Sequence, residues 1–437
     1  MTSECWRPEP DVDVVGVGFG PSNLALAIAI HEGGGQSARF FERKPAFAWH
    51  RGMLIDDATM QVSFLKDLAT MRNPASDFSF VSFLHQRGRL VDFINFKTLF
   101  PLRIEFHEYL EWAAARLSHL VSYAHDVIDV EPVRDADERL VAFDVVAIDE
   151  RGARRVTRAR NVVVATGLTP VLPAGVERDE HVWHTSELLD RAGRLAASGA
   201  TPGRFVVVGA GQSAAEAVAY LHREFTSAEV CGVFAKFGYS PADDSPFANR
   251  IFDPDAVALF HGAPSEIKRS LIDYHRNTNY SVVDADLIEA LYRQHYRERV
   301  QGRERLRMMG ASRIEHLDVG DHGVDAVVAS LATGDRALLR CDAIVFATGY
   351  RPADPAILLG QTGGLCRHDD CGLVVMRSDH SVALTEPSEG AIYLQGATEH
   401  AFGLASSLLS TVAVRAGQIL DAMTARRGAG RSASVVA

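Results

Sequence analysis

Two stretches of the sequence have the residue types and spacing of loops that bind the diphosphate of a dinucleotide. They read VVGVGFGPSN at 14–23 and VVVGAGQSAAE at 206–216. In such loops glycine lets the backbone approach a phosphate closely, and the following helix offers free N–H groups and the positive end of its dipole. Two such loops in one chain imply that a hydride passes from a nicotinamide nucleotide to a flavin.

The first loop departs from the G-x-G-x-x-G pattern, because a proline takes the place of the third glycine. Proline lacks an N–H and has a helical φ, which suits the first position of a helix, so diphosphate binding is compatible with it. Glu42 ends the next predicted strand about twenty residues on, where a carboxylate accepts hydrogen bonds from a ribose diol and repels a 2′-phosphate. The first site is therefore predicted to favour FAD or NAD over NADP. Its loop residues are Gly16, Gly18, Gly20, Pro21 and Ser22.

The second loop contains Gly209 and Gly211, with alanine at the third position, a variant that such loops tolerate. The strand after its helix is predicted to end at Lys236, where no acidic residue stands. A cation at this point suits a 2′-phosphate. The second site is therefore predicted to bind NADPH in preference to NADH.

Each loop connects a valine-rich strand to a helix. VDVVGV at 12–17 has the continuous apolar character of a buried parallel strand, and a helix and a second strand follow it. The same order recurs over 204–236. The phrases NVVVATGLTP at 161–170 and DAIVFATGYRP at 342–352 flank this second unit. This order indicates that one nucleotide-binding domain is interrupted by another.

The predicted fold class is α/β, with two nested Rossmann-like dinucleotide-binding domains, for FAD and NADPH, and a small, mostly helical substrate region. The predicted division of the chain is 1–165 for the first part of the FAD domain, 166–340 for the NADPH domain with a substrate-contacting insert around 240–285, 341–420 for the completion of the FAD domain and the substrate region, and 421–437 for a disordered tail.

The composition argues against several classes of protein. The formal net charge is −11 and Lys and Arg do not cluster, which disfavours nucleic-acid binding. No run of about eighteen apolar residues occurs, so no membrane span is expected. The first residues lack the pattern of a secretory signal, and a cytoplasmic protein is predicted. Five cysteines occur without a C-x-x-C pair, which disfavours a disulfide reductase, and their spacing predicts no metal site.

Seven segments occur in an order that is specific as a set: VGVGFGPSNLALA, ERKPAFAWHRGM, MQVSFLKDLATMRNP, VVVGAGQSAAE, DDSPFANRIFDP, NTNYSVVD and FATGYRP. Together they resemble the flavin-dependent N-hydroxylating monooxygenases of the lysine N6-/ornithine N5-monooxygenase family, from residue 11 to residue 415. The resemblance implies that FAD, NADPH and O₂ hydroxylate the side-chain amine of L-ornithine to N5-hydroxy-L-ornithine, through a C4a-hydroperoxyflavin. It further implies a place in siderophore or related hydroxamate biosynthesis, and a homo-oligomer such as a tetramer.

The resemblance also implies roles for individual residues. Those implied to bind FAD, besides the first loop, are Glu42, Lys44, Trp49, His50, Gln61, Val127 and Ser407. Those implied to bind NADPH, besides Gly209 and Gly211, are Gln212, Ser213, Lys236 and Asn279. Those implied to bind the substrate are Lys66 and Asn249 at its carboxylate, Asn279 at its amine, and Ser410. The resemblance implies no certain catalytic residue. The flavin would carry the chemistry, and Gln61 and Asn279 would position the reactants. Phe402 stands where relatives often carry histidine, and it receives no polar role.

These residues agree with the chemistry of N-hydroxylation. The reacting amine has an ordinary pKa of about 10.4. Because only its neutral form has a lone pair, the site must favour deprotonation. A carboxylate beside the amine would oppose this, whereas Asn279 is neutral. A cation such as Lys66 and an amide such as Asn249 are groups that pair with a substrate carboxylate.

Other functions stay open on the sequence alone. L-Lysine is an alternative substrate. It is one methylene longer than L-ornithine, and one methylene changes the free energy of transition-state binding by only about 1–3 kcal/mol. A different class of flavin monooxygenase, such as a Baeyer–Villiger enzyme, is an alternative because HVWHTSEL at 181–188 is similar to part of their fingerprint. A redox sensor without turnover would also need both nucleotide-binding loops, but this function would not explain the presence of Lys66.

Overall fold

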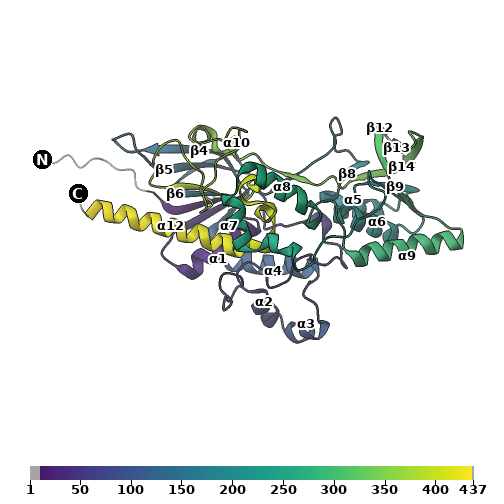
Figure 1. Ribbon diagram of the computed structural model, residues 1–437, viewed down its shortest axis with the longest axis horizontal. Coiled ribbons are helices and arrows are strands. Elements are labelled where there is room, and N and C mark those ends of the chain that lie inside the picture. The colour runs from purple at the N-terminus through teal and green to yellow at the C-terminus, as the bar shows by residue number, and fades with distance from the viewer. Residues whose placement is uncertain (1–9, 436–437) are drawn as a thin grey trace.

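The computed structural model describes residues 10–435 and shows two α/β lobes side by side (Figure 1). The first lobe contains a seven-stranded sheet. Its strands in spatial order are β3 (Val121–Tyr123), β2 (Ala38–Glu42), β1 (Val12–Val17), β6 (Arg154–Val164), β5 (Leu140–Asp149) and β4 (His125–Arg134), with β17 (Ala391–Leu394) also paired to β6.

The centre of this sheet is parallel and buried. β1 pairs in parallel with β2 and β6, and Val14 and Val15 have no exposed surface, as expected for a strand covered on both faces. β17 returns from far along the chain to pair in parallel with the end of β6, with Ala391 opposite Asn161. β4 and β5 extend the sheet in antiparallel fashion. The nested order predicted for the first domain is therefore confirmed.

Helices cover the first sheet. They are α1 (Pro21–Gly33), α4 (Arg103–Arg116) and α12 (Val412–Val435), while α2 (Phe80–Gln86) and α3 (Leu90–Phe96) lie beyond α4, farther from the sheet (Figure 1). α1 is buried continuously from Asn23 to Ile30, because it packs against α4 and α12 in the same hydrophobic core. Within residues 10–435, no helix has the length and apolar character needed to cross a bilayer.

The second lobe has its own parallel sheet. Its strands in order are β11 (Leu306–Met309), β10 (Glu229–Val233), β9 (Arg204–Val208), β15 (Ala343–Phe346) and β8 (Val182–His184). Around it lie α5 (Leu188–Ala197), α6 (Gln212–Glu224) and α9 (Ala285–Gln301), and an antiparallel sheet of β12 (Ser312–Gly320), β13 (Gly323–Ser330) and β14 (Arg336–Cys341).

Two short strands join the lobes. They are β7 (Leu168–Pro170) and β16 (Tyr350–Pro352), which pair in antiparallel fashion where the chain enters and leaves the second lobe. The predicted boundary at residue 340 is wrong by one strand, because β15 belongs to the second sheet. The second lobe therefore ends at β16. A strand deep in a parallel sheet looks the same in sequence whichever sheet it joins.

Small helices occupy the region between the lobes. They are the 3₁₀ helix η4 (Ala248–Phe252), α7 (Pro254–Gly262), α8 (Ser265–His275), α11 (Glu399–Phe402), and the 3₁₀ helices η6 (Leu404–Ser407) and η7 (Leu409–Thr411). The short helix α10 (Pro355–Gly363) packs instead on β4 of the first lobe (Figure 1). The helical character predicted for the substrate region is confirmed for α7, α8 and η4.

The predicted disorder from residue 421 is also wrong, because α12 continues through Val435. Met423 is buried in the core beside α1. Arg426 pairs with Asp379 at 3.3 Å and Arg427 with Asp13 at 3.4 Å. These tertiary contacts outweigh the low helix propensity of a Gly- and Ser-rich segment. Residues 436–437 lie outside the described part of the chain.

Candidate functional site

The first glycine loop connects β1 to α1 and faces the ends of β6 and β17. Gly18 has φ +82°, and a Cβ there would lie 2.5 Å from the carbonyl oxygen of Ala165. Gly20 is different, because a Cβ there would meet nothing within 4 Å. Its surroundings are open, as a bound diphosphate requires. Pro21 stands in the first turn of α1, as predicted.

The start of α1 carries unsatisfied donors. Gly20 supplies no side-chain cap and the first turn has no acidic residue. The N–H groups of Ser22 and Asn23 therefore lack intrahelical partners and lie at the positive end of the helix dipole. This arrangement fits the diphosphate of FAD.

Glu42 stands at the end of β2, as predicted, and its carboxylate is held in place. One oxygen accepts a hydrogen bond from Phe19 N at 2.8 Å and the other from Lys44 N at 3.0 Å. Each carboxylate oxygen has a second lone pair for a ribose hydroxyl. Val127 lies buried in the same cluster as Phe41, so β4 borders this end of the site.

The second loop connects β9 to α6. Gly209 has φ +147°, and a Cβ there would lie 2.7 Å from the carbonyl oxygen of Ala347. A Cβ on Gly211 would touch Ser281 at 3.6 Å. The Lys236 ammonium donates to the Ser281 carbonyl at 2.7 Å. β10 ends at Val233, three residues before Lys236, so Lys236 lies on the following loop and not on the strand as predicted.

One carboxylate connects residues assigned to the two cofactors. The amide of Gln61 donates to Asp284 Oδ1 at 3.0 Å, and the amide of Gln212 donates to Asp284 Oδ2 at 2.9 Å. The Asp284 N–H donates back to Gln212 Oε1 at 2.8 Å. Burial raises the pKa of Asp284 above its ordinary value, although the Gln61 hydrogen bond works to lower it. A residue predicted to bind FAD and a residue predicted to bind NADPH thus meet at Asp284.

A buried ion pair lies next to the hydrogen bonds of Asp284, because Gln212 contacts both. Arg103, at the start of α4, forms two hydrogen bonds with Glu216 of α6, at 2.6 and 2.8 Å. Arg103 also donates to the carbonyl oxygen of Met53 at 2.9 Å, and Gln212 donates to Glu216 at 3.0 Å. Both charged side chains are nearly buried, with 12% and 7% exposed surface. The pair therefore joins the two lobes at a point largely shielded from water.

Three segments that carry predicted site residues contact one another: the segment of Asn249, the segment of Asn279, and the segment from α11 to η7. The backbone of Asp243 donates to Asn277 at 3.1 Å, which joins the segment of Asn249 to that of Asn279. Phe252 packs on Leu404 and Ala405, which brings η4 beside η6. The Tyr280 hydroxyl donates to Glu399 of α11. The side chain of Asn249 donates to the carbonyl oxygen of Asp244 at 2.7 Å. Ser407 is exposed at the end of η6, whereas Ser410 is buried in η7.

Lys66 precedes Asp67, whose buried carboxylate organises this loop of the first lobe. Asp67 accepts from Thr70 N at 2.6 Å, Phe80 N at 2.7 Å and Ala69 N at 2.9 Å. Burial raises the pKa of Asp67 despite these bonds. The half-buried Lys66 ammonium has no ion-pair partner within residues 10–435.

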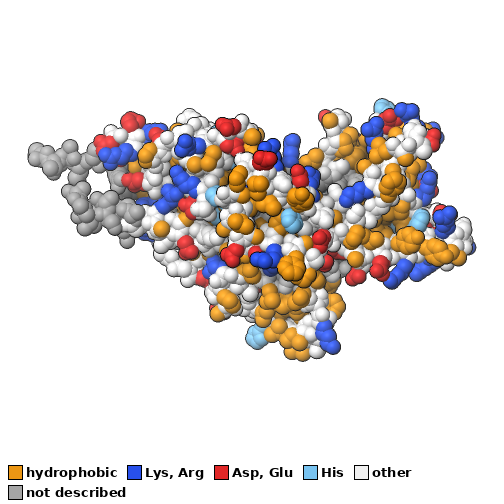
Figure 2. Space-filling model, in the orientation of Figure 1, with side chains coloured by type: hydrophobic (Ala, Val, Ile, Leu, Met, Phe, Trp, Pro, Cys, Tyr) orange, Lys and Arg blue, Asp and Glu red, His pale blue; other side chains and the backbone are white. Residues whose placement is uncertain are grey.

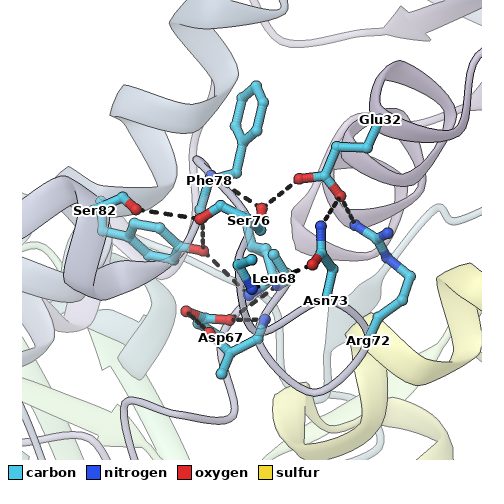
Figure 3. Close-up of polar contacts among 12 residues, drawn as sticks. Glu32, Asp67, Leu68, Arg72, Asn73, Ser76, Phe78 and Ser82 are labelled. Atoms are coloured by element: carbon cyan, nitrogen blue, oxygen red, sulfur yellow. Dashed lines mark hydrogen bonds and ion pairs between the residues drawn. The ribbon is translucent and has the colours of Figure 1, made fainter.

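A second carboxylate fastens this loop to α1. Glu32 accepts from Arg72 and from Ser76, both at 2.5 Å, and from Asn73 at 3.3 Å (Figure 3). Burial works to raise the pKa of Glu32, but the hydrogen bonds outweigh it and the pKa lies below its ordinary value. The loop that carries Lys66 is therefore rigidly attached to the first lobe.

Replacement of Asp67 by alanine is expected to lower the free energy of unfolding by about 2–3 kcal/mol, because buried backbone donors lose their acceptor. The KM for the substrate should rise as well, since Lys66 loses its support. Denaturant unfolding and steady-state kinetics measure both. The exposed Asp77 in the same loop provides a matched control, and an equal effect of Asp77→Ala would contradict this role.

The aromatic residues assigned to FAD stand on the segment after β2. The rings of Trp49 and His50 lie 4.8 Å apart, and Trp49 stacks on His107 at 6.5 Å. His50 has φ +48° and lies 6.2 Å from Tyr350 at the crossing between the lobes. Phe402 is buried between His380 and His261, in agreement with its lack of a polar role.

Four residues that support the site were not predicted from the sequence: Arg103, Glu216, Asp284 and Asp67. Asp284, Asp67 and Glu216 lie within the quoted segments NTNYSVVD, MQVSFLKDLATMRNP and VVVGAGQSAAE, so their position beside assigned residues was a usable signal. Arg103 and Glu216 are 113 residues apart and no pattern connects them. Only the packing of the two lobes brings them together.

The fold and the paired loops define the class of protein: an oxidoreductase with two dinucleotide-binding domains, one inserted into the other. Within that class the chain belongs to the L-lysine 6-monooxygenase/L-ornithine 5-monooxygenase family, whose model matches residues 11–352. The family predicted from the sequence is thereby confirmed.

Named relatives cover nearly the whole chain. An L-ornithine N(5)-monooxygenase from Burkholderia cepacia is 41% identical over 90% of this chain and 89% of its own length. The structure of an ornithine N-hydroxylase from Kutzneria sp. 744 with reduced FAD, NADP⁺ and L-ornithine superposes with a TM-score of 0.91 and 45% identity, over 96% of this chain and all of that one. An ornithine hydroxylase from Pseudomonas aeruginosa has a TM-score of 0.87 and 34% identity, over 95% and 99%.

Proposed function

We propose that this protein is an FAD- and NADPH-dependent L-ornithine N5-monooxygenase. The observation that carries the proposal is the meeting of the two nucleotide sites at Asp284, which holds Gln61 of one lobe and Gln212 of the other. Such contact supports a nicotinamide bound beside a flavin ring. Bound FAD would supply the activation of O₂, and the protein residues would bind, orient and exclude water.

The proposed role of each residue follows from its position in the two nucleotide-binding loops and their neighbouring segments. The start of α1 and Glu42 would hold the diphosphate and ribose of FAD, with Trp49, His50 and Gln61 nearer the ring. The start of α6 would hold the diphosphate of NADPH. Ser213 contributes a hydroxyl there, and Lys236 a charge at the 2′-phosphate.

The substrate is proposed to bind between the loop of Lys66 and the segments of Asn249, Asn279 and Ser410. The Lys66 ammonium has no ion-pair partner among the described residues, which supports a substrate carboxylate as its partner. Asn279 is neutral and two residues from Ser281, which touches the second glycine loop. It would therefore place the amine near the nicotinamide without favouring its protonated form.

L-Ornithine is proposed over L-lysine because the relatives with the greatest likeness described above are ornithine hydroxylases. The test is a product assay for hydroxylated amine with ornithine, lysine and 2,4-diaminobutanoate side by side. Preference for lysine would replace the proposed substrate, and oxidation of NADPH without any hydroxylated amine would overturn the function.

Lys236→Ala is expected to raise the KM for NADPH about tenfold and leave that for NADH nearly unchanged, because only NADPH carries the 2′-phosphate charge. Kinetics with both nucleotides measure this. The NADH arm is an internal control, because a general disturbance of the Ser281 contact would affect both nucleotides equally. Wild-type protein without NADPH preference would contradict the role.

A homo-oligomer is also proposed. Val91, Ile94 and Phe96 of α3 are each at least 60% exposed, and apolar side chains gather at this lower edge of the molecule in Figure 2. Such patches are typical of protein interfaces. The expected mass by light scattering is a multiple of 47.6 kDa, and Ile94→Asp should reduce it.

A cytoplasmic location stays a proposal, supported by the unpaired state of Cys231, Cys341, Cys366 and Cys371.

A further inference from the structure

Arg415 is a buried cation that has no counter-ion within residues 10–435. It lies in the first turn of α12 with 6% of its surface exposed. Its guanidinium donates to the Ser406 carbonyl at 2.8 Å, to Gln395 Oε1 at 3.3 Å and to Ser22 Oγ at 3.4 Å. All three acceptors are neutral. No carboxylate pairs with Arg415 in the part of the chain that the structure describes.

The position of Arg415 beside the start of α1 makes its buried positive charge energetically more unfavourable. Ser22 belongs to the first turn of α1, where free N–H groups and the helix dipole already create positive potential. Burial lowers the pKa of Arg415 to about 10, so the side chain stays protonated at neutral pH. A buried cation at the positive end of a helix is unfavourable unless an anion binds nearby.

Gln395 connects Arg415 to the same loop. Its amide donates to the Ser22 carbonyl at 3.2 Å and to Asn23 Oδ1 at 3.0 Å, while its oxygen accepts from Arg415. Gln395 also lines a hollow at the ends of β6 and β17, together with Thr166, Gly167 and Gly396. The cation and the amide therefore both contact Ser22, which lies in the first turn of α1 directly after Gly20 and Pro21.

We propose that Arg415 is a cofactor-binding residue that supplies, from behind Ser22 and the start of α1, the positive charge that the diphosphate of FAD neutralises. This inference rests on the proposed function, because it requires FAD at the first glycine loop. It assigns a binding role to the helix that closes the first lobe and that lies nearly 400 residues from the loop it serves.

The test is the affinity of the FAD-free protein for FAD, measured by flavin fluorescence at low and high salt. Arg415→Met and Arg415→Gln remove the charge, and the second keeps a hydrogen-bonding side chain. Both are expected to weaken FAD binding by about 10- to 100-fold and to reduce its salt dependence. Arg415→Lys, which keeps the charge, should bind FAD within a few-fold of the wild type.

Stability separates a binding role from a structural one. The FAD-free Arg415→Met protein should unfold at the same temperature as the wild type or higher, because an uncompensated buried charge is gone, and FAD should raise that temperature less. Arg426→Met is the matched control on the same helix, since Arg426 already pairs with Asp379; its FAD affinity should not change. Riboflavin, which lacks the diphosphate, should not distinguish the Arg415 variants.

The outcomes are distinct. Equal FAD affinity in the wild type and both neutral variants, an equal loss of riboflavin binding, or an unfolding temperature lowered only in the FAD-free variant would overturn the role of Arg415. Wild-type protein that binds no FAD would overturn the proposed function and this inference with it.

Discussion

Lys66→Ala is expected to raise the KM for L-ornithine by about 10- to 100-fold, while oxidation of NADPH in the absence of substrate continues. A hydrogen bond to a charged partner is worth about 1.5–3 kcal/mol, which corresponds to this range. The Lys66 ammonium lacks an ion-pair partner within the described residues, so its charge is available to a substrate carboxylate. Steady-state kinetics of hydroxylated product against ornithine concentration measure the effect.

The charge can be separated from the volume of the side chain. Lys66→Met keeps most of the length and should behave like Lys66→Ala. Putrescine, which is ornithine without its carboxylate, should be a poor substrate for the wild type and should be affected little by either change. If both variants reduce turnover of ornithine and putrescine by the same factor, Lys66 does not bind the carboxylate.

Removal of either partner of the Arg103–Glu216 pair is expected to lower the free energy of unfolding by about 3–5 kcal/mol, because the remaining charge stays buried without a counter-ion. The pair bridges the two lobes with distances of 2.6 and 2.8 Å. Glu216→Leu and Arg103→Met are the single variants. Their unfolding is measured by denaturant with probes in each lobe, because two lobes need not unfold together.

The double variant provides the control. Arg103→Met with Glu216→Leu leaves no buried charge and should recover most of the stability lost in either single variant. The KM for NADPH should still rise in the double variant, since Gln212 loses its hydrogen bond to Glu216. Additive losses of stability in the double variant would show that the two residues act independently and would contradict the bridge.

The sequence alone determined the features that depend on local chain geometry. Gly18 and Gly209 have positive φ and no room for a Cβ, so their identity reveals the loops. Pro21 at the start of α1 and Glu42 at the end of β2 were also predictable, because each is specified by neighbours within one β-turn-α-β unit. The family resemblance followed from segments of this local kind.

Only the tertiary structure decided which distant residues meet. It placed β15 in the second sheet, extended α12 past residue 421, and brought Asp284 between Gln61 and Gln212. It also buried Arg415 behind a loop from the other end of the chain. Such pairings depend on how two lobes and a closing helix pack. A periodic pattern in sequence records only which face of an element is apolar, not which partner covers it.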